Sequence, residues 1–393
     1  MRVLSLFDGK SSGYTACELA GIEVTEYYSA EVDKYAIKVS DAIHPNQVRI
    51  GDVIYVEKAM RWKDSTIEKA LSSKWLKKGR EKLKNALPVR GVKFDMIFGG
   101  FPCQAWSMAG KQLGDKDKRG MLFWTMLDIM KHVRHHNPKA DFLIENVKMK
   151  KEFEEYITFH MNNAVGDVHK ILINSALVSA QNRNRYYWTS FPVTQPEDKG
   201  IVWGDVRERG VNEFYYTEKG LQWLARHSQR KEKQLGIWGD DEKAQMVEAS
   251  HYKNYSAQRF FGICDLPDDE SVIAAMRGRY LVDGKRNDKQ QASKGNTAQF
   301  IEFRHDNKSN SLTTVQKDNV VVPFTLPNRI PVDMFFFRYI APRECFRLQT
   351  VPEHYIDKIL TCGVSNTQLY KIAGNGWTDE VIAHILRCMI NKQ

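Results

Sequence analysis

The first half of the chain alternates short apolar runs with segments whose apolar residues recur every three or four positions. A short run bounded by polar residues or glycine predicts a buried strand, and the longer period predicts an amphipathic helix. Strands are predicted at Arg2–Phe7, Val24–Ala30, Phe94–Phe98 and Phe142–Ile144. Helices are predicted at Ser12–Ala20, Lys34–Ile43 and Met121–Val133. This alternation predicts an α/β protein with a doubly wound, mostly parallel sheet covered by helices on both faces.

The pattern weakens after about residue 200. Residues 200–330 are richer in Gly, Asn, Gln, Lys and Asp, and contain short strand-like pieces such as Val320–Val322. We predict a second, smaller and irregular domain for this region. Helical periodicity returns from about Phe335, so we expect residues 331–393 to complete the first domain, which otherwise covers residues 1–199.

Composition limits the class of protein. With 393 residues, of which 42% are hydrophobic, the chain can form a substantial core. It has no run of 18 uncharged apolar residues, so we expect no membrane span. The N-terminus resembles a first strand rather than a signal peptide. The six cysteines are scattered and form no CxxC pair, which favours a reduced, cytoplasmic protein without a zinc site or other metal centre.

The net charge of +10 is concentrated in one segment. Residues 58–93 contain 12 lysine or arginine residues and three acidic ones. One interpretation is a solvated helical face, and the other is electrostatic contact with a polyanion such as nucleic acid. Charge alone does not distinguish them.

The ends of the first three predicted strands carry residues suited to a nucleoside. In a doubly wound sheet, ligands bind at the carboxyl ends of the strands. Glu31 follows the second strand, where a carboxylate takes ribose hydroxyls, and Asp52 could accept a hydrogen bond from an adenine amino group. Glycines in the first loop let backbone amides approach a ligand, and the following helix N-terminus favours an anion. That loop contains Phe7, Asp8, Gly9, Lys10, Ser11 and Gly13.

Later strand ends carry reactive side chains. Cys103 follows a proline at the end of the Phe94–Phe98 strand, a position that favours an accessible thiol over a packed one. Glu145 follows three apolar residues, and partial desolvation favours its protonated form, so it can hold and donate a proton. Gln181, Arg183 and Arg185 alternate on one face of a strand, and their guanidinium groups suit phosphate or carbonyl oxygens.

Taken together, these motifs resemble the DNA (cytosine-5)-methyltransferase family, and the compact length resembles a bacterial or phage enzyme. The combination of PCQ, ENV and QxRxR is highly specific. The matching segments occur in the family's order over nearly the whole chain: Phe7-Asp8-Gly9, Glu31, Gly51-Asp52-Val53, Gly100-Phe101-Pro102-Cys103-Gln104, Glu145-Asn146-Val147, Gln181-x-Arg183-x-Arg185, Pro342-Arg343-Glu344-Cys345-x-Arg347-Leu348-Gln349 and Gly374-Asn375-Gly376.

The resemblance implies a Rossmann-like class I methyltransferase fold and a chemistry for the site. Cys103 would add to C6 of cytosine, which makes C5 nucleophilic. Glu145 would bind N3 and the amino group, and Arg185 would hold O2. Arg183 and Gln181 would support the loop or contact a phosphate. The target base would have to be flipped out of the duplex.

The resemblance also implies S-adenosylmethionine as cofactor and double-stranded DNA as partner of a monomeric, nucleoid-associated protein. The methionine end of the cofactor would lie near Asn375, and Val32 and Val53 would also contact the cofactor. Residues 200–322 correspond to the family's target-recognition region. The implied DNA contacts are Gln104, Ser107, Gln181, Arg277, Arg279, Thr313 and Thr314, with Lys285 and Arg286 as further candidates.

Lys10 departs from the family pattern, which commonly has an apolar residue here. Three interpretations follow. The side chain reaches solvent; or it pairs with the methionine carboxylate or a DNA phosphate; or it accepts an anionic donor such as carboxy-S-adenosylmethionine, so that a carboxymethyl group reaches C5.

Three alternative functions compete with DNA methylation. An RNA cytosine-5 methyltransferase could use the same motifs, but the long variable region favours DNA. An inactive DNA-binding module is disfavoured because Cys103, Glu145 and Arg185 are all present. A thiol enzyme acting on free nucleotides is disfavoured by the basic segment and the large second domain.

Overall fold

The computed structural model describes residues 1–73, 77–102, 120–208 and 340–391, together with short strands between residues 263 and 338. The chain forms two compact units. The first comprises Met1–Ile173, Asn184–Pro196 and Asp379–Gln393, and the second comprises Asn174–Arg183 and Glu197–Thr378. Within the described residues, no helix is long and apolar enough to cross a membrane.

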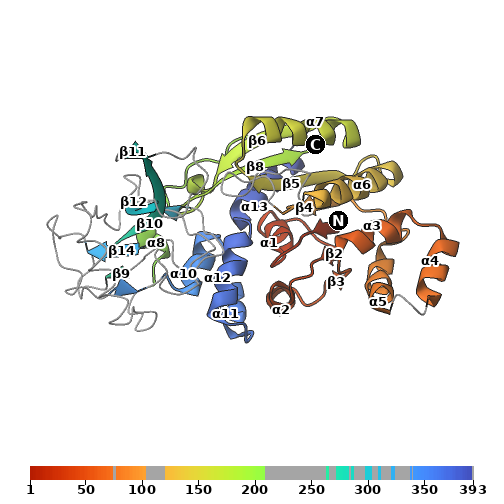
Figure 1. The fold of residues 1–393 in the computed structure, drawn as a ribbon, viewed down its shortest axis with the longest axis horizontal. Coiled ribbons are helices and arrows are strands. Elements are labelled where there is room, and N and C mark those ends of the chain that lie inside the picture. The colour runs from red at the N-terminus through yellow and green to blue at the C-terminus, as the bar shows by residue number, and fades with distance from the viewer. Residues whose placement is uncertain are drawn as a thin grey trace. The chain divides into compact units, whose positions relative to one another are not determined.

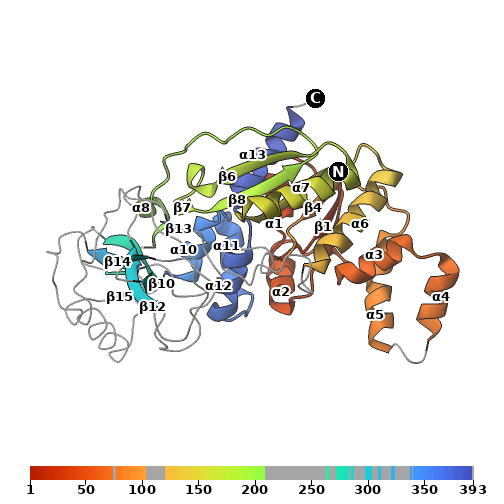
Figure 2. The ribbon, with the colours of Figure 1, turned by 45° about the horizontal axis from the view of Figure 1, so that its top comes forward.

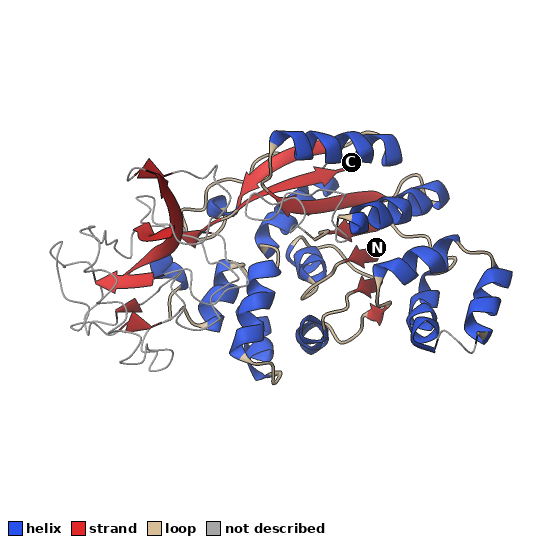
Figure 3. Ribbon diagram, viewed as in Figure 1, coloured by secondary structure: helices blue, strands red, loops and turns tan. Residues whose placement is uncertain are grey.

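A seven-stranded sheet forms the centre of the first unit (Figure 3). Its first five strands in chain order are parallel, and β8 runs antiparallel to β5. The predicted doubly wound, mostly parallel fold is therefore confirmed. In spatial order the strands are β3 (Val48–Arg49), β2 (Glu26–Ala30), β1 (Arg2–Leu6), β4 (Met96–Gly99), β5 (Asp141–Val147), β8 (Asn184–Thr189) and β6 (His169–Asn174).

Helices cover both faces of this sheet (Figures 1 and 2). On one face, buried side chains of β1, β4 and β5 share a core with three helices: α3 (Val53–Arg61), α6 (Met121–His136) and α7 (Lys151–Val165). On the other face, α1 (Ser12–Leu19) lies so close to β4 that a Cβ at Gly13 would meet the Phe98 ring at 2.5 Å. α13 (Asp379–Ile390) packs against α1, and α2 (Lys34–Ile43) follows β2.

The basic segment folds into two helices and a single turn, of which the second helix and the turn pack on α3. These are α4 (Asp64–Ser72), α5 (Lys77–Ala86) and the 3-10 helix η1 (Leu87–Val89). Ile67, Leu83 and Val89 are buried and belong to the main core of the first unit. The segment is thus part of the first unit, and its helices α4 and α5 follow α3 in the chain (Figure 1).

The second unit combines helices with an antiparallel sheet. The central strand is β10 (Ser271–Val282), which pairs with β11 (Lys285–Arg286), β12 (Thr297–Glu302) and β14 (Val320–Pro323). The other elements are η4 (Ser175–Leu177), β7 (Gln181–Asn182), α8 (Trp203–Val206), β9 (Ile263–Cys264), β13 (Ser309–Asn310), β15 (Phe337–Arg338), α10 (Pro342–Leu348), α11 (Glu353–Thr361) and α12 (Asn366–Asn375).

The C-terminal segment is divided between the units. The sequence predicts that residues 331–393 complete the first domain, but only α13 lies in the first unit. The helices before it join the second unit because they bond to residues 174–183. The Ser179 hydroxyl and the Gln181 amide both donate to the carbonyl of Leu348, at 2.7 and 3.0 Å.

Candidate active site

The loop after β1 has an unusual backbone. Phe7, Gly9 and Ser11 all have φ between 58° and 64°, in the left-handed region. For a residue with a side chain, this conformation costs about 1–2 kcal/mol. The loop therefore needs contacts that hold it, and the structure provides a separate one at each of three consecutive residues.

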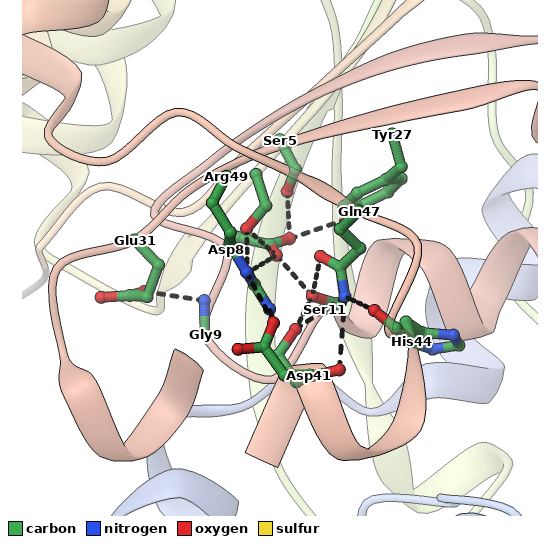
Figure 4. A network of polar contacts seen from close by, with 12 residues as sticks. Ser5, Asp8, Gly9, Ser11, Tyr27, Glu31, Asp41, His44, Gln47 and Arg49 are labelled. Carbon is green, nitrogen blue, oxygen red and sulfur yellow. Dashed lines mark hydrogen bonds and ion pairs between the residues drawn. The ribbon is translucent and has the colours of Figure 1, made fainter. Parts of the chain in front are cut away.

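The first contact is a hydrogen-bond network around Asp8 (Figure 4). The Asp8 side chain is buried, and its carboxylate accepts hydrogen bonds from four hydroxyl groups. The donors are Ser5 (2.5 Å), Ser11 (2.5 Å), Ser29 (2.6 Å) and Tyr27 (2.7 Å). The Arg49 guanidinium lies 3.9 Å away and compensates part of the buried charge. Asp8 thereby fixes the loop to β1 and β2.

The second contact is made by Glu31, which follows β2. One oxygen accepts from the Gly9 N–H at 2.8 Å, and the other accepts from the amides of Val32 and Asp33 at 2.7 and 2.8 Å. Burial raises the pKa of this carboxyl, and the backbone donors oppose that shift. The side chain of Val32 is 68% exposed, so an apolar surface lies next to a fixed carboxylate. This arrangement suits a nucleoside, with polar ribose and apolar base.

The third contact is an ion pair made by Lys10. Its ammonium lies 2.7 Å from both carboxylate oxygens of Asp379, and both side chains are fully buried. The interpretation that Lys10 reaches solvent is therefore wrong. The sequence did not indicate this partner, because Asp379 lies 369 positions away along the chain.

Asp52 lies three residues after β3 and begins α3. One of its oxygens accepts from the Ile54 amide at 3.1 Å, and the other lies 3.0 Å from the Lys82 ammonium. Val53 is buried in the core of the first unit, and its contact with the cofactor remains a prediction. The contact between Asp52 and an adenine amino group remains a prediction.

Glu145 and Arg185 come together on one face of the sheet. In the antiparallel pairing of β5 with β8, Glu145 lies opposite Tyr187, and Val147 lies opposite Arg185. The two charged residues are therefore diagonal neighbours on the same face. Arg185 Nε is 2.9 Å from Glu145 Oε1, and each side chain keeps slightly more than a tenth of its surface exposed.

Asn146 connects these residues to the segment that carries the predicted nucleophile. Its side-chain amide donates to the carbonyl of Phe101 at 2.9 Å. Phe101 and Pro102 directly precede Cys103 in the sequence. Cys103, Gln104 and Ser107 themselves lie outside the described residues. The role of Asn146 was missed from the sequence, although its place in the ENV motif could have indicated it.

In the second unit, Gln181 and Arg183 support the backbone. Both are buried. The Arg183 guanidinium donates to the carbonyls of Gly374 (3.2 Å) and Gly376 (2.8 Å), on either side of Asn375. Gln181 donates to the carbonyl of Leu348, so the predicted direct contact with DNA does not fit its position. For Arg183, the structure shows loop support and no exposed surface for a phosphate.

The predicted recognition contacts are only partly within the described residues. Arg277 and Arg279 lie in β10, in register with Phe300 and Ala298 of β12. Lys285 and Arg286 form β11. Thr313 and Thr314 lie outside the described residues.

The sheet topology and the charged residues at its strand ends define a Rossmann-like enzyme of the methyltransferase class. The model of the C-5 cytosine-specific DNA methylase family matches residues 1–391, and the chain belongs to this family.

Curated relatives agree with this assignment, and solved structures share the fold. The type II methyltransferase M.HpaII of Haemophilus parainfluenzae is 34% identical over 72% of this chain and 68% of its own length. The orphan methyltransferase M.SPRI of Bacillus phage SPR is 26% identical, covering 100% of this chain and 98% of its own. The Entamoeba histolytica methyltransferase EhMeth has a similar fold, with a TM-score of 0.60 at 15% identity over 100% of this chain and 98% of that chain. A Spodoptera frugiperda DNMT2 mutant gives 0.57 at 17% identity over 99% of both chains.

Proposed function

We propose that the protein transfers a methyl group from S-adenosylmethionine to C5 of cytosine in double-stranded DNA. The observation that carries this proposal is the pairing of Glu145 with Arg185 on one face of the sheet, tied through Asn146 to the backbone just before Cys103. A proton donor and a carbonyl-binding cation next to a thiol are the groups that activation of a cytosine ring requires.

Each residue has a defined role in this proposal. The Cys103 thiolate adds to C6 of a flipped-out cytosine, Glu145 holds a proton at N3, and Arg185 binds O2. Charge then accumulates at C5, which becomes nucleophilic. After C5 is alkylated, loss of its proton breaks the bond between Cys103 and C6 and restores the thiolate. S-adenosylmethionine, when bound, supplies the methyl group.

The loop after β1 fits the proposed donor. Glu31 is held by backbone amides and can accept hydrogen bonds from ribose hydroxyls, beside the exposed Val32. The Lys10 ammonium already has an anionic partner in Asp379. We therefore propose the ordinary donor in preference to carboxy-S-adenosylmethionine. Competition between the two donors tests this choice, and mass spectrometry of the nucleoside should detect 5-methylcytosine without 5-carboxymethylcytosine.

DNA is the proposed substrate because the variable region between the QxRxR and PRECxRLQ motifs is long and contains Arg277 and Arg279. The assay is methyl transfer to duplex DNA compared with tRNA, followed by bisulfite sequencing of modified DNA. We expect transfer to duplex DNA only. Transfer to tRNA alone would favour the RNA-modifying alternative.

Replacement of Cys103 tests the chemistry. We expect Cys103→Ser to abolish product while DNA binding is largely retained, because the hydroxyl is a far weaker nucleophile than the thiolate. The wild-type protein should also form a covalent adduct with duplexes containing 5-fluorocytosine, whose C5 carries no proton to lose. Cys264→Ser, which changes a cysteine outside the motifs, is the matched control. Near wild-type activity of Cys103→Ser would exclude the proposed nucleophile.

A further inference from the structure

The Lys10–Asp379 pair is a buried contact between the cofactor loop and a helix that comes last in the first unit. Asp379 is the first residue of α13, and its carboxylate also accepts a hydrogen bond from Ser12, the first residue of α1. One carboxylate therefore holds the end of the loop and the start of the helix that follows it.

The pair is directional in a way that an apolar contact is not. Both carboxylate oxygens of Asp379 lie 2.7 Å from the Lys10 ammonium, so two hydrogen bonds fix the position of that group. Its neighbours Gly9 and Ser11 are two of the three left-handed residues of the loop, and Gly9 supplies the amide bonded to Glu31. Displacement of Lys10 would therefore move the group that fixes the predicted ribose-binding carboxylate.

We infer that Lys10 and Asp379 form a positioning pair that holds the cofactor loop in its donor-binding conformation. Lys10 does not touch the donor in this inference, but acts through Gly9 and Glu31. Buried ion pairs are weak evidence for added stability, yet removal of one partner leaves an uncompensated buried charge. The structure gives this pair a second role, because the loop that it fixes has a conformation that residues with side chains rarely adopt.

Three variants separate positioning from stability. Lys10→Met removes one charge, Lys10→Met with Asp379→Leu removes both, and Lys170→Met breaks the ion pair with Glu154 in the same unit, between β6 and α7. The measurements are the Kd for S-adenosylmethionine, Tm, and hydrogen exchange of the Gly9 and Ser11 amides. Because the inference rests on the proposed function, hydrogen exchange provides a readout that needs no donor.

We expect Lys10→Met to lower Tm, to speed exchange at Gly9 and Ser11, and to weaken donor binding about tenfold, equivalent to about 1.4 kcal/mol. The double variant should recover Tm, but its donor binding should stay at least about fivefold weaker, since Leu cannot accept from Ser12. Lys170→Met should lower Tm without changing donor affinity.

Two results would overturn the inference. One is unchanged donor affinity in Lys10→Met despite a lower Tm, and the other is full recovery of both donor affinity and slow exchange in the double variant. If the wild-type protein binds no S-adenosylmethionine, the proposed function fails. Faster exchange at Gly9 and Ser11 in Lys10→Met alone would still support the positioning pair in that case, and unchanged exchange would overturn it.

Discussion

Arg183 shows how a residue of a catalytic motif can serve the backbone. Its guanidinium donates to the carbonyls of Gly374 and Gly376, and so fixes the C-terminal end of α12, where Asn375 is the last residue. A lysine offers a single ammonium group, which is not shaped to reach two separate carbonyls as the planar guanidinium is. The arginine at this position is therefore specified by the geometry of this helix end.

Replacement of Arg183 should be strongly destabilising, because its guanidinium donates to two backbone carbonyls. In Arg183→Met, two carbonyls lose their donors, and each buried unsatisfied polar group costs about 1–3 kcal/mol. We expect the free energy of unfolding to fall by at least that amount, with methyl transfer reduced. Urea unfolding measures the first effect.

Arg343→Met is the matched control for this prediction. Arg343 forms exposed ion pairs with Glu353 and Asp357, and such pairs contribute about 0–1 kcal/mol. Equal losses of stability in the two variants would show that the bonds of Arg183 to the end of α12 are not what stabilises it.

The sequence predicts where a residue lies when a motif indicates its role. It does not when the position depends on a partner far away along the chain. The position of Glu31 after β2 was predicted correctly from spacing. The burial of Lys10 was not, because a lysine in a glycine-rich loop ordinarily reaches solvent. The network around Asp8 was also missed, since serine and tyrosine on neighbouring strands give no periodic signal.

At the scale of elements, α6 ends in a cluster of histidines that gives stability a pH dependence. Burial lowers the pKa of His132 from 6.5 to about 4, and the positive charges of His136, His135, Arg61 and Arg90 act in the same direction. The unfolded chain then binds this proton more tightly than the folded one. The contribution is fully present above pH 6.5 and is lost as pH falls toward 4.

The loss of stability that His132 causes at low pH can be measured. We expect wild-type stability to decline between pH 7.5 and pH 5, and His132→Gln to lose less over the same interval. Thermal unfolding at the two pH values measures this. His354→Gln, which changes an exposed histidine on α11, should follow the wild type. Parallel curves for wild type and His132→Gln would contradict the prediction.

The basic segment carries two kinds of cation. Several are paired within the protein, including Arg61 with Asp128, Lys82 with Asp52, and Arg90 with Asp64. In the part of the chain that the structure describes, Lys69 and Lys78 form no ion pair, and both are exposed. Phosphate contact, if the segment makes it, is expected from this second kind.

The salt dependence of DNA binding tests these two lysines. Replacement of Lys69 and Lys78 by glutamine should weaken binding to target and non-target duplexes alike. The log–log slope against salt should fall by about 0.9 for each lost contact. The control variant, Lys131→Gln with Lys139→Gln, also removes two positive charges, but outside residues 58–93. A slope that is unchanged relative to this control would favour the interpretation of residues 58–93 as a solvated helical face.

Element types were predictable here and element ends were not. The strand predicted at Phe142–Ile144 extends to Asp141–Val147, because Glu145 and Asn146 continue the pairing with β8 although they are polar. The hydrophobic pattern indicates which residues are buried. The end of a strand is set instead by where its backbone hydrogen bonds to the neighbouring strand end. Glu145, the proposed proton donor, lies in that extension.

At the scale of the whole molecule, the first unit is assembled from three separate stretches of chain. Local patterns cannot show such an assembly, which is why residues 331–393 were assigned to one domain. Of that segment, residues 379–393 lie in the first unit, where Val381, Ile382 and Leu386 of α13 are buried. His384 of α13 bonds the carbonyl of Thr194 at 2.8 Å, so the two later stretches meet.

A shortened chain tests whether this unit is self-contained. Residues 1–196 joined to residues 379–393 by about 12 Gly/Ser residues, which span roughly 20 Å, should fold and keep near-native sheet content. Residues 1–196 alone should not, because Lys10 would be buried without its carboxylate. Circular dichroism and amide NMR distinguish the outcomes. Equal folding of both chains would show that α13 is dispensable.

The distance along the chain between Lys10 and Asp379 also has a consequence for biosynthesis. At a translation rate of about 5–20 residues per second, roughly 20 to 70 s separate the synthesis of the two residues. During that interval the first loop has been made, but the ion pair with Asp379, one of the three contacts that hold the loop, cannot form. A nascent chain on the ribosome, and any chain released before α13 is made, would hold the donor poorly. On the proposed function, methyl transfer would thus begin only after α13 has been made.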